Sequence, residues 1–196
     1  RSCTDDEVRI VRVYDDKRAE PDDLVPMDGK TPGEIIIFPC FKSTLTYPGN
    51  EELTKDKFYK GWIYTHDLGT WDKNQFITVS GRKDDMIISS GENIYPAQVE
   101  EAINCHPSVA DCIVTAVPDK ARGEAVVAYV IPKDDSLTIK DLNKYCANHP
   151  DLSAYKCPRF YCFVDKIPYN ATGKKLHYVV KAQAPEDLEK GILQKP

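Results

Sequence analysis

A short charged stretch at residues 81–85, GRKDD, divides the chain into two parts with different hydrophobic patterns. Before it, apolar residues form short segments that alternate as strands do, and no helix long enough to cover a sheet is predicted. After it, strand-like segments alternate with segments whose apolar residues recur at helical spacing. We therefore predict a β-rich part over residues 1–80, a hinge at 81–85 and a separate domain over 86–196.

The first part is predicted to consist of short strands joined by loops. Residues 8–14 alternate apolar and polar side chains, as a half-buried strand does, and residues 34–38 form a nearly continuous apolar run typical of a buried strand. Two more strands are predicted at 62–64 and 75–79, with a short helix at 51–58. This sheet has no helix to cover it, so part of its packing partner is lacking.

The second part is predicted to be a small α+β domain in which a mixed sheet is flanked by helices. The order over residues 86–164 is β-α-β-β-α-β. Pro96 is favoured in the first turn of a helix at 96–104, and Thr138 is a good N-cap for the next helix. Residues 89–93 are expected to form a tight loop, and the polar tail from Pro185 is expected to fray.

Composition limits the class of protein and its compartment. The 196 residues carry 31 acidic and 26 basic side chains, and the net charge of -5 argues against nucleic-acid binding through bulk charge. There is no run of 18 apolar residues and nothing resembling a secretion signal at the N-terminus. The seven cysteines contain no CxxC pair and the four histidines no i,i+4 pair. We therefore predict no disulfide framework and no bound metal, and we expect a cytoplasmic protein.

Several polar residues have the chemistry to bind a nucleotide-like ligand. A carboxylate such as Asp67, predicted at a strand end, can accept both hydroxyls of a ribose, and Arg82 offers a bidentate fork for phosphate or ribose oxygens. The small residues Ser89-Ser90-Gly91 would let backbone approach a thin ligand closely. Lys174 follows turn-forming residues and would place a compact positive charge at a loop tip. Taken singly, such residues are more often ordinary turn, linker or surface residues.

In combination, these stretches closely resemble the C-terminal part of the AMP-forming acyl-CoA synthetases, within the superfamily of adenylate-forming ligases. The resemblance extends from about Val8 to Lys174, in the family's order and spacing. It implies that a carboxylate attacks the α-phosphate of Mg-ATP to give an acyl-adenylate, and that the CoA thiol then displaces AMP. ATP, Mg²⁺ and CoA are thus the expected substrates and cofactor of the full enzyme. The matching stretches are residues 33–35, 61–69, 81–87, 91–96, 99–100, 122–124, 155–159 and 168–174.

The resemblance also implies roles for individual residues. Asp67 matches the acid that holds the ribose hydroxyls, Arg82 the arginine near the ribose and phosphate, and Lys174 the catalytic lysine of adenylation. Asp84 matches the hinge residue, with Lys83 beside it, and rotation there would exchange two loops at one active site. The residues implied for CoA binding are Ser89, Ser90 and Gly91 along the pantetheine path, and the cations Arg122, Lys156 and Arg159 at the CoA phosphates.

Some features depart from the family pattern. His66 replaces the glycine that usually precedes the ribose acid, and Ser90 stands where many members have glycine. The chain contains no Gly/Ser/Thr-rich phosphate loop and no acyl pocket, which in the family belong to a large N-terminal domain. Residues 1–80 are therefore expected to be the end of that domain. The chain is expected to be a C-terminal fragment that is inactive without it, and the acyl substrate cannot be read from it.

Two alternative functions remain open. The first is an adenylation domain that serves a carrier protein, whose pantetheine arm would use the same path. Arg122 and Lys156 favour free CoA, because a carrier-bound arm has no nucleotide to hold. The second is a non-catalytic module that binds CoA or docks to a partner. The presence of Lys174, Asp67 and Arg82 argues against it, because a binding module needs none of them.

Overall fold

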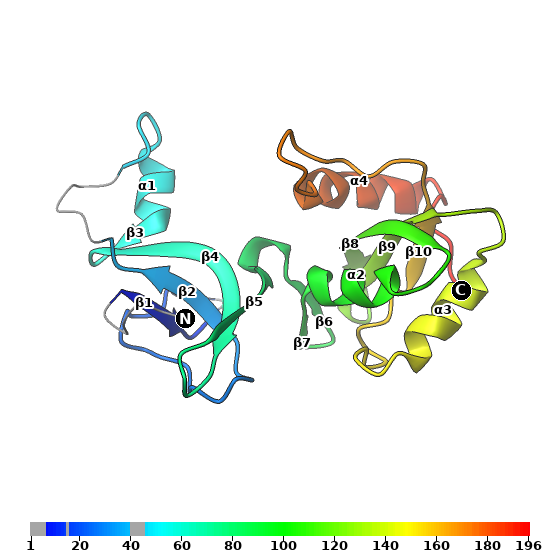
Figure 1. Cartoon of the computed structure of the whole chain (residues 1–196). Coiled ribbons are helices and arrows are strands. Elements are labelled where there is room, and N and C mark those ends of the chain that lie inside the picture. Colours follow the sequence, from blue (N-terminus) through cyan, green and yellow to red (C-terminus); the bar gives the residue numbers. More distant parts are fainter. Residues whose placement is uncertain (1–6, 15, 40–45) are drawn as a thin grey trace. The chain divides into compact units, whose positions relative to one another are not determined.

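A computed structural model of the chain describes residues 7–14, 16–39 and 46–196 (Figure 1). Cys3 and Cys40 lie outside the described residues. The chain divides into two compact units, one ending at Asp84 and the other running from Asp85 to Pro196. Each unit has its own sheet and its own core, and each is described by itself.

The first unit contains β1 (Val8–Val11), β2 (Gly33–Ile37), α1 (Glu51–Lys57), β3 (Phe58–Tyr59), β4 (Trp62–Trp71), β5 (Ile77–Arg82) and the beginning of a 3₁₀ turn, η1 (Lys83–Asp85). In the described residues, its strands form one antiparallel sheet in the order β1-β2-β4-β3, and β5 pairs with β4. Side chains such as Ile36, Tyr64 and Trp71 are buried against it. The strands predicted near residues 8–14 and 34–38 and the helix predicted at 51–58 are thus confirmed.

Strand β4 is much longer than its apolar pattern indicates, and it is strongly curved (Figure 1). Against β2, Tyr64 pairs with Ile36 and Leu68 pairs with Glu34, so four steps along β4 match only two along β2. The surplus residues form a bulge, which lets polar residues interrupt the apolar pattern without ending the strand. The prediction that Asp67 lies at a strand end is therefore wrong, because the strand continues past it to Trp71.

The second unit contains β6 (Ile87–Ser89), β7 (Glu92–Ile94), α2 (Pro96–Asn104), β8 (Val109–Asp119), β9 (Gly123–Pro132), α3 (Ile139–Asn148), β10 (Phe160–Phe163) and α4 (His177–Glu189). Its strands follow the order β10-β9-β6-β7, and β8 pairs with β9. Strand β10 is parallel to β9, whereas the other pairs are antiparallel. The predicted α+β class with a mixed sheet is confirmed.

Both faces of the second sheet are covered, which explains the nearly continuous apolar runs of β8 and β9. Alternate residues of these strands point to opposite faces, so neighbours such as Ile113 and Val114 belong to different core clusters. Helices α2 and α3 pack on the face that carries Val114, and α4 packs on the face that carries Ile113. Thr138 caps α3 as predicted, because its hydroxyl accepts a hydrogen bond from the N–H of Asp141 at 3.2 Å.

The loop after β6 is shorter than the predicted five residues. Ser89 closes β6 and Glu92 opens β7, so only Ser90 and Gly91 form the turn. Both turn residues have positive φ, 54° and 80°. Two-residue hairpin turns favour this geometry because its twist matches that of the flanking strands.

The tail does not fray from Pro185 as predicted. Pro185 lies inside α4, which continues to Glu189, and Asp187 is buried and accepts a hydrogen bond from the hydroxyl of Tyr129 at 2.7 Å. Beyond the helix, Leu193 is buried, and the backbones of Gln194 and Tyr161 exchange two hydrogen bonds of 2.9 Å. Contacts with distant strands thus order a segment whose local sequence is polar.

Replacing Leu193 by alanine should therefore lower the free energy of unfolding of the second unit by about 2–3 kcal/mol, because a buried leucine is replaced by a partly filled cavity. Ile192→Ala is the matched control, since Ile192 is 43% exposed and Leu193 only 7%. Urea unfolding of the two variants would measure the difference. Equal effects at both positions would show that the tail is not packed as described.

Candidate functional site

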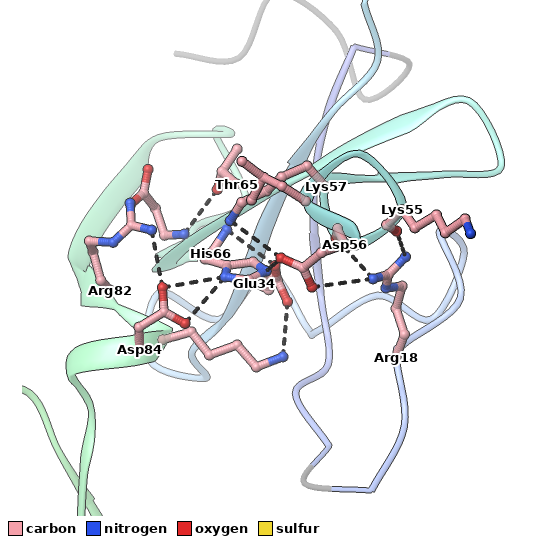
Figure 2. Close-up of polar contacts among 12 residues, drawn as sticks. Arg18, Glu34, Lys55, Asp56, Lys57, Thr65, His66, Arg82 and Asp84 are labelled. Atoms are coloured by element: carbon pink, nitrogen blue, oxygen red, sulfur yellow. Dashed lines mark hydrogen bonds and ion pairs between the residues drawn. The ribbon is translucent and has the colours of Figure 1, made fainter. Parts of the chain in front are cut away.

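Asp67 and Arg82 are directly opposed in the paired strands β4 and β5. The Arg82 Nη1 lies 3.2 Å from Asp67 Oδ1, and its Nη2 lies 3.2 Å from Asp84 Oδ2 (Figure 2). One guanidinium thus joins the candidate ribose acid to the candidate hinge residue. Burial raises the pKa of Asp84, but the hydrogen bond from Arg82 and the charge of His66 outweigh it and hold that pKa below its ordinary value.

His66 fills the bulge of β4 with a positive φ of 62°, a conformation that usually favours glycine. Its Nδ1 lies 3.2 Å from Asp84 Oδ1, and its Nε2 lies 3.2 Å from Asp56 Oδ2 of α1 (Figure 2). The imidazole thus bridges two carboxylates. The backbone shape that glycine would allow is kept, while the side chain ties α1 to residue 84.

Glu34 is a buried carboxylate beneath this cluster that the sequence analysis did not single out. It is 4% exposed, and its oxygens accept hydrogen bonds from the His66 N–H at 3.2 Å and the Lys83 Nζ at 3.3 Å (Figure 2). It therefore supports both the bulge and the candidate hinge. The sequence did contain a signal for this residue: Glu34 directly precedes an apolar run that is predicted to be buried. A buried charge requires partners, so such a glutamate is expected to be bonded.

The loop before α4 holds Lys174 at a defined backbone position. The Asn170 Oδ1 accepts hydrogen bonds from the Lys174 N–H at 2.8 Å and the Thr172 N–H at 3.0 Å. The Asn170 N–H donates to the Lys174 carbonyl at 2.9 Å, and Gly173 adopts a positive φ of 80°. The side chain of Lys174 is exposed. The turn chemistry expected from Asn170 and Gly173 is therefore present.

Of the candidate CoA residues, the structure brings the β6–β7 turn close to Arg122. The Ser90 N–H donates to the Arg122 carbonyl at 2.8 Å, and Ser89 pairs with Gly123 across the strands. Ser89 itself is buried, and its hydroxyl donates to the Glu124 carbonyl at 2.7 Å, so Ser90 and Gly91 form the exposed part.

The remaining candidates lie elsewhere on the second unit. Lys156 follows α3, and its Nζ donates to Gln98 Oε1 at 3.0 Å, whereas Arg159 is an exposed residue immediately before β10. Over residues 7–14, 16–39 and 46–196, no three His, Cys, Asp or Glu side chains group as metal ligands would. Within the same ranges, no helix has the length and apolar character needed to cross a membrane.

Comparison with known proteins identifies a family domain within the second unit. Residues 98–174 match the family model of the AMP-binding enzyme C-terminal domain. Among curated proteins, the chain is similar to the 2-succinylbenzoate–CoA ligase of Bacillus licheniformis, with 40% identity over 132 residues, which are 67% of this chain and 27% of that ligase. The chain thus spans about a quarter of that relative's length.

Solved structures agree with this match. The chain is similar to the o-succinylbenzoate CoA synthetase of Bacillus subtilis in complex with its acyl-adenylate OSB-AMP, with 34% identity and a TM-score of 0.74 over 89% of this chain and 33% of that one. It is also similar to the anthranilate CoA ligase AuaEII in complex with anthranoyl-AMP, with 27% identity and a TM-score of 0.77 over 93% of this chain and 34% of that one. Residues 98–174 therefore belong to the AMP-binding enzyme C-terminal domain family, and the chain as a whole is similar to the C-terminal portion of AMP-forming CoA ligases.

Proposed function

We propose that this chain is the C-terminal part of a cytoplasmic, ATP-dependent acyl-CoA synthetase. In the full enzyme, a carboxylate attacks the α-phosphorus of ATP, which leaves pyrophosphate and an acyl-adenylate. The thiol of CoA then attacks the acyl carbon and releases AMP. The observation that carries the proposal is the Asp67–Arg82 pair together with the exposed Lys174, within a chain that aligns with acyl-CoA synthetases over most of its length.

On the nucleotide side, Asp67 would accept the two ribose hydroxyls of ATP. Its ion pair with Arg82, at 3.2 Å, supports this role because it orients the carboxylate and keeps a cation next to the ribose and phosphate. Bound Mg²⁺ would supply charge neutralisation at the phosphates. The described residues include no set of metal ligands, so we assign no residue of this chain to it.

Lys174 would bridge the carboxylate and the nucleotide during adenylation. Its ammonium would neutralise the negative charge that develops at the α-phosphate and hold the two anions together. The hydrogen bonds of Asn170 support this role, because they hold the backbone of Lys174 while leaving its side chain exposed. Thioester formation would then need a different loop at the same site.

For the second step, we propose that rotation at Asp84, with Lys83 beside it, brings the Ser90–Gly91 turn to the site in place of Lys174. The boundary between the two compact units, between Asp84 and Asp85, supports a hinge there. The small turn residues would line the pantetheine arm. Buried Ser89 would support them, and the CoA phosphates would meet the cations Arg122, Lys156 and Arg159.

The rest of the active site would come from an N-terminal domain of the same protein. That the larger part of this domain lies outside residues 1–84 is supported by the exposed apolar side chains Phe76 (57%), just before β5, and Val79 (62%), in β5, because exposed apolar surface is typical of a face that packs against another part of a protein. The acyl pocket would lie in that domain. The names of the curated relatives make 2-succinylbenzoate the first carboxylic acid to test.

The proposal is tested by incubating the full-length enzyme with ATP, Mg²⁺, CoA and 2-succinylbenzoate or other carboxylic acids, and measuring AMP, pyrophosphate and acyl-CoA. We expect acyl-CoA and AMP in equal amounts from one of the acids. The 196-residue chain alone should give neither product. Turnover by that chain unaided would contradict the fragment interpretation. Transfer to a phosphopantetheinyl carrier protein but not to CoA would instead support a carrier-linked adenylation domain.

A further inference from the structure

A buried carboxylate contacts the residues that flank the Lys174 loop. The loop is residues 170–174, and its stem is Tyr169 on one side and residues 175–177 on the other. Glu100 of α2 is 7% exposed, and its Oε1 lies 2.7 Å from His177 Nε2 and accepts the Val114 N–H at 2.8 Å. Its Oε2 lies 3.4 Å from the Nζ of Lys175. Such a carboxylate is costly to bury unless donors surround it, and two of its donors come from residues just after Lys174.

A second carboxylate holds the stem from both sides. Asp111 of β8 pairs with Lys175 Nζ at 2.8 Å and accepts a hydrogen bond from the hydroxyl of Tyr169, which precedes the loop. Burial raises the pKa of Asp111, but the hydrogen bonds from Lys175 and Tyr169 hold it below its ordinary value. The backbones of Tyr169 and Lys175 also pair as an isolated β-bridge, so both ends of the loop are fixed.

We propose that Glu100 is a positioning residue for Lys174: by binding His177 and Lys175, it fixes the stem of the loop and thereby the direction in which the catalytic ammonium points. The structural part of this proposal, that Glu100 orders the loop, stands without the proposed function. The catalytic part rests on it, because an ordered loop matters only if Lys174 takes part in adenylation.

The charge of His177 makes the contact between Glu100 and the stem of the loop sensitive to pH. The groups that act on its ring are Glu100, Asp85 and Lys175, and Glu124 and Lys181 line the same small cleft. The hydrogen bond from His177 to Glu100 raises the pKa of His177 above its ordinary value of 6.5, against the opposing effect of burial. The ion pair is therefore complete below pH 6.5 and weakens as the pH rises through the raised pKa of the folded state.

Hydrogen exchange of the 196-residue chain tests the structural part. The Lys174 and Leu176 amides, which donate to Asn170 and Pro168, should exchange about tenfold faster in Glu100→Gln than in the wild type. The exposed neighbour Glu101, changed to Gln, is the matched control and should leave both rates unchanged. Protection of these amides, corrected for intrinsic exchange, should also fall with rising pH in the wild type but not in His177→Gln.

If Glu100→Gln also loses protection in β8 and β9, that variant has destabilised the whole unit, and His177→Gln becomes the deciding test. The side chain of His177 is partly exposed, and its replacement leaves the contacts of Glu100 with Val114 and Lys175 in place. Loss of protection confined to the loop in that variant supports the proposal. Unchanged protection of the loop in His177→Gln overturns it.

Half-reactions of the full-length enzyme test the catalytic part. Glu100→Gln should lower kcat for acyl-adenylate formation about tenfold, with little change in the KM for ATP, and should alter thioester formation from supplied adenylate by less than about twofold. Combined with Lys174→Ala, it should cause no further loss. Equal losses in both half-reactions, or fully additive losses, would overturn it. If Lys174→Ala alone leaves adenylation intact, the proposed function fails instead, while the exchange result stands.

Discussion

Replacing Lys174 by alanine in the full-length enzyme should slow acyl-adenylate formation by about 10²–10³-fold, the usual cost of removing one preorganised charge from a transition state. The exposed ammonium is the only group of this loop that we assign to the α-phosphate. Thioester formation from supplied acyl-adenylate should change by no more than a few-fold, because we propose that a different loop serves that step. Single-turnover assays with pyrophosphate release and acyl-CoA formation would measure the two steps separately.

The matched control is Lys166→Ala, which removes an exposed lysine from the segment between β10 and the Lys174 loop. It should leave both steps unchanged. Equal loss of both steps in Lys174→Ala would refute the assignment of the lysine to adenylation. A loss that appears only with CoA as the second substrate would reassign it to thioester formation.

Replacing Asp67 by asparagine should raise the KM for ATP by about 10- to 100-fold, because an amide cannot replace two charge-assisted hydrogen bonds to the ribose hydroxyls. Both half-reactions should be weakened, since the AMP moiety is bound in each of them. This shared loss distinguishes Asp67 from Lys174. Arg82 would also lose a partner at 3.2 Å, so its contact with Asp84 would be its remaining ion pair in this cluster.

Two measurements keep this prediction specific. Glu52→Gln removes an exposed carboxylate of α1 in the same unit and should leave the KM for ATP unchanged. Circular dichroism and thermal unfolding should be the same for Asp67→Asn and the wild type, because the Asp67 side chain is only partly buried. An unchanged KM for ATP in a folded Asp67→Asn variant would remove Asp67 from the nucleotide site.

His66 illustrates how a departure from a family pattern can preserve the backbone. The resemblance implies a glycine before the candidate ribose acid Asp67, and here His66 adopts a positive φ of 62° that glycine favours. Its ring contacts Asp56 and Asp84 at 3.2 Å each. Those two contacts with carboxylates offset the strain that a side chain incurs in this conformation. The substitution therefore adds a contact to residue 84 without straightening the bulge.

The sequence predicted most of the regular elements because their signals are local. Thr138 and Pro96 mark helix starts through their own backbone and side-chain chemistry, and both helices begin where these residues indicate. The predicted α+β class with a mixed sheet followed from the order of strand and helix signals over residues 86–164, and the nearly continuous apolar runs of β8 and β9 reflect burial on two faces. The roles of the candidate site residues came from the resemblance to the acyl-CoA synthetases, and they remain predictions.

The missed features depend on contacts between distant residues. The extent of β4 beyond Tyr64 depends on pairing with β2 and β5, which no local pattern of Thr65, His66 and Asp67 indicates. The order of the tail after Pro185 depends on the buried Asp187 and on strands more than thirty residues away.

From the sequence alone came the fold class, the prediction of a two-part organisation and the resemblance to a family, because the order of strand and helix signals and the matching motifs lie along the chain itself. Only the tertiary structure showed which charges hold the candidate loops in place. Glu34 and Glu100 look like ordinary glutamates in sequence, yet each is buried and bonded to a residue next to a candidate functional group. The physical reason is that the cost of burying a carboxylate is set by donors that only the fold brings to it.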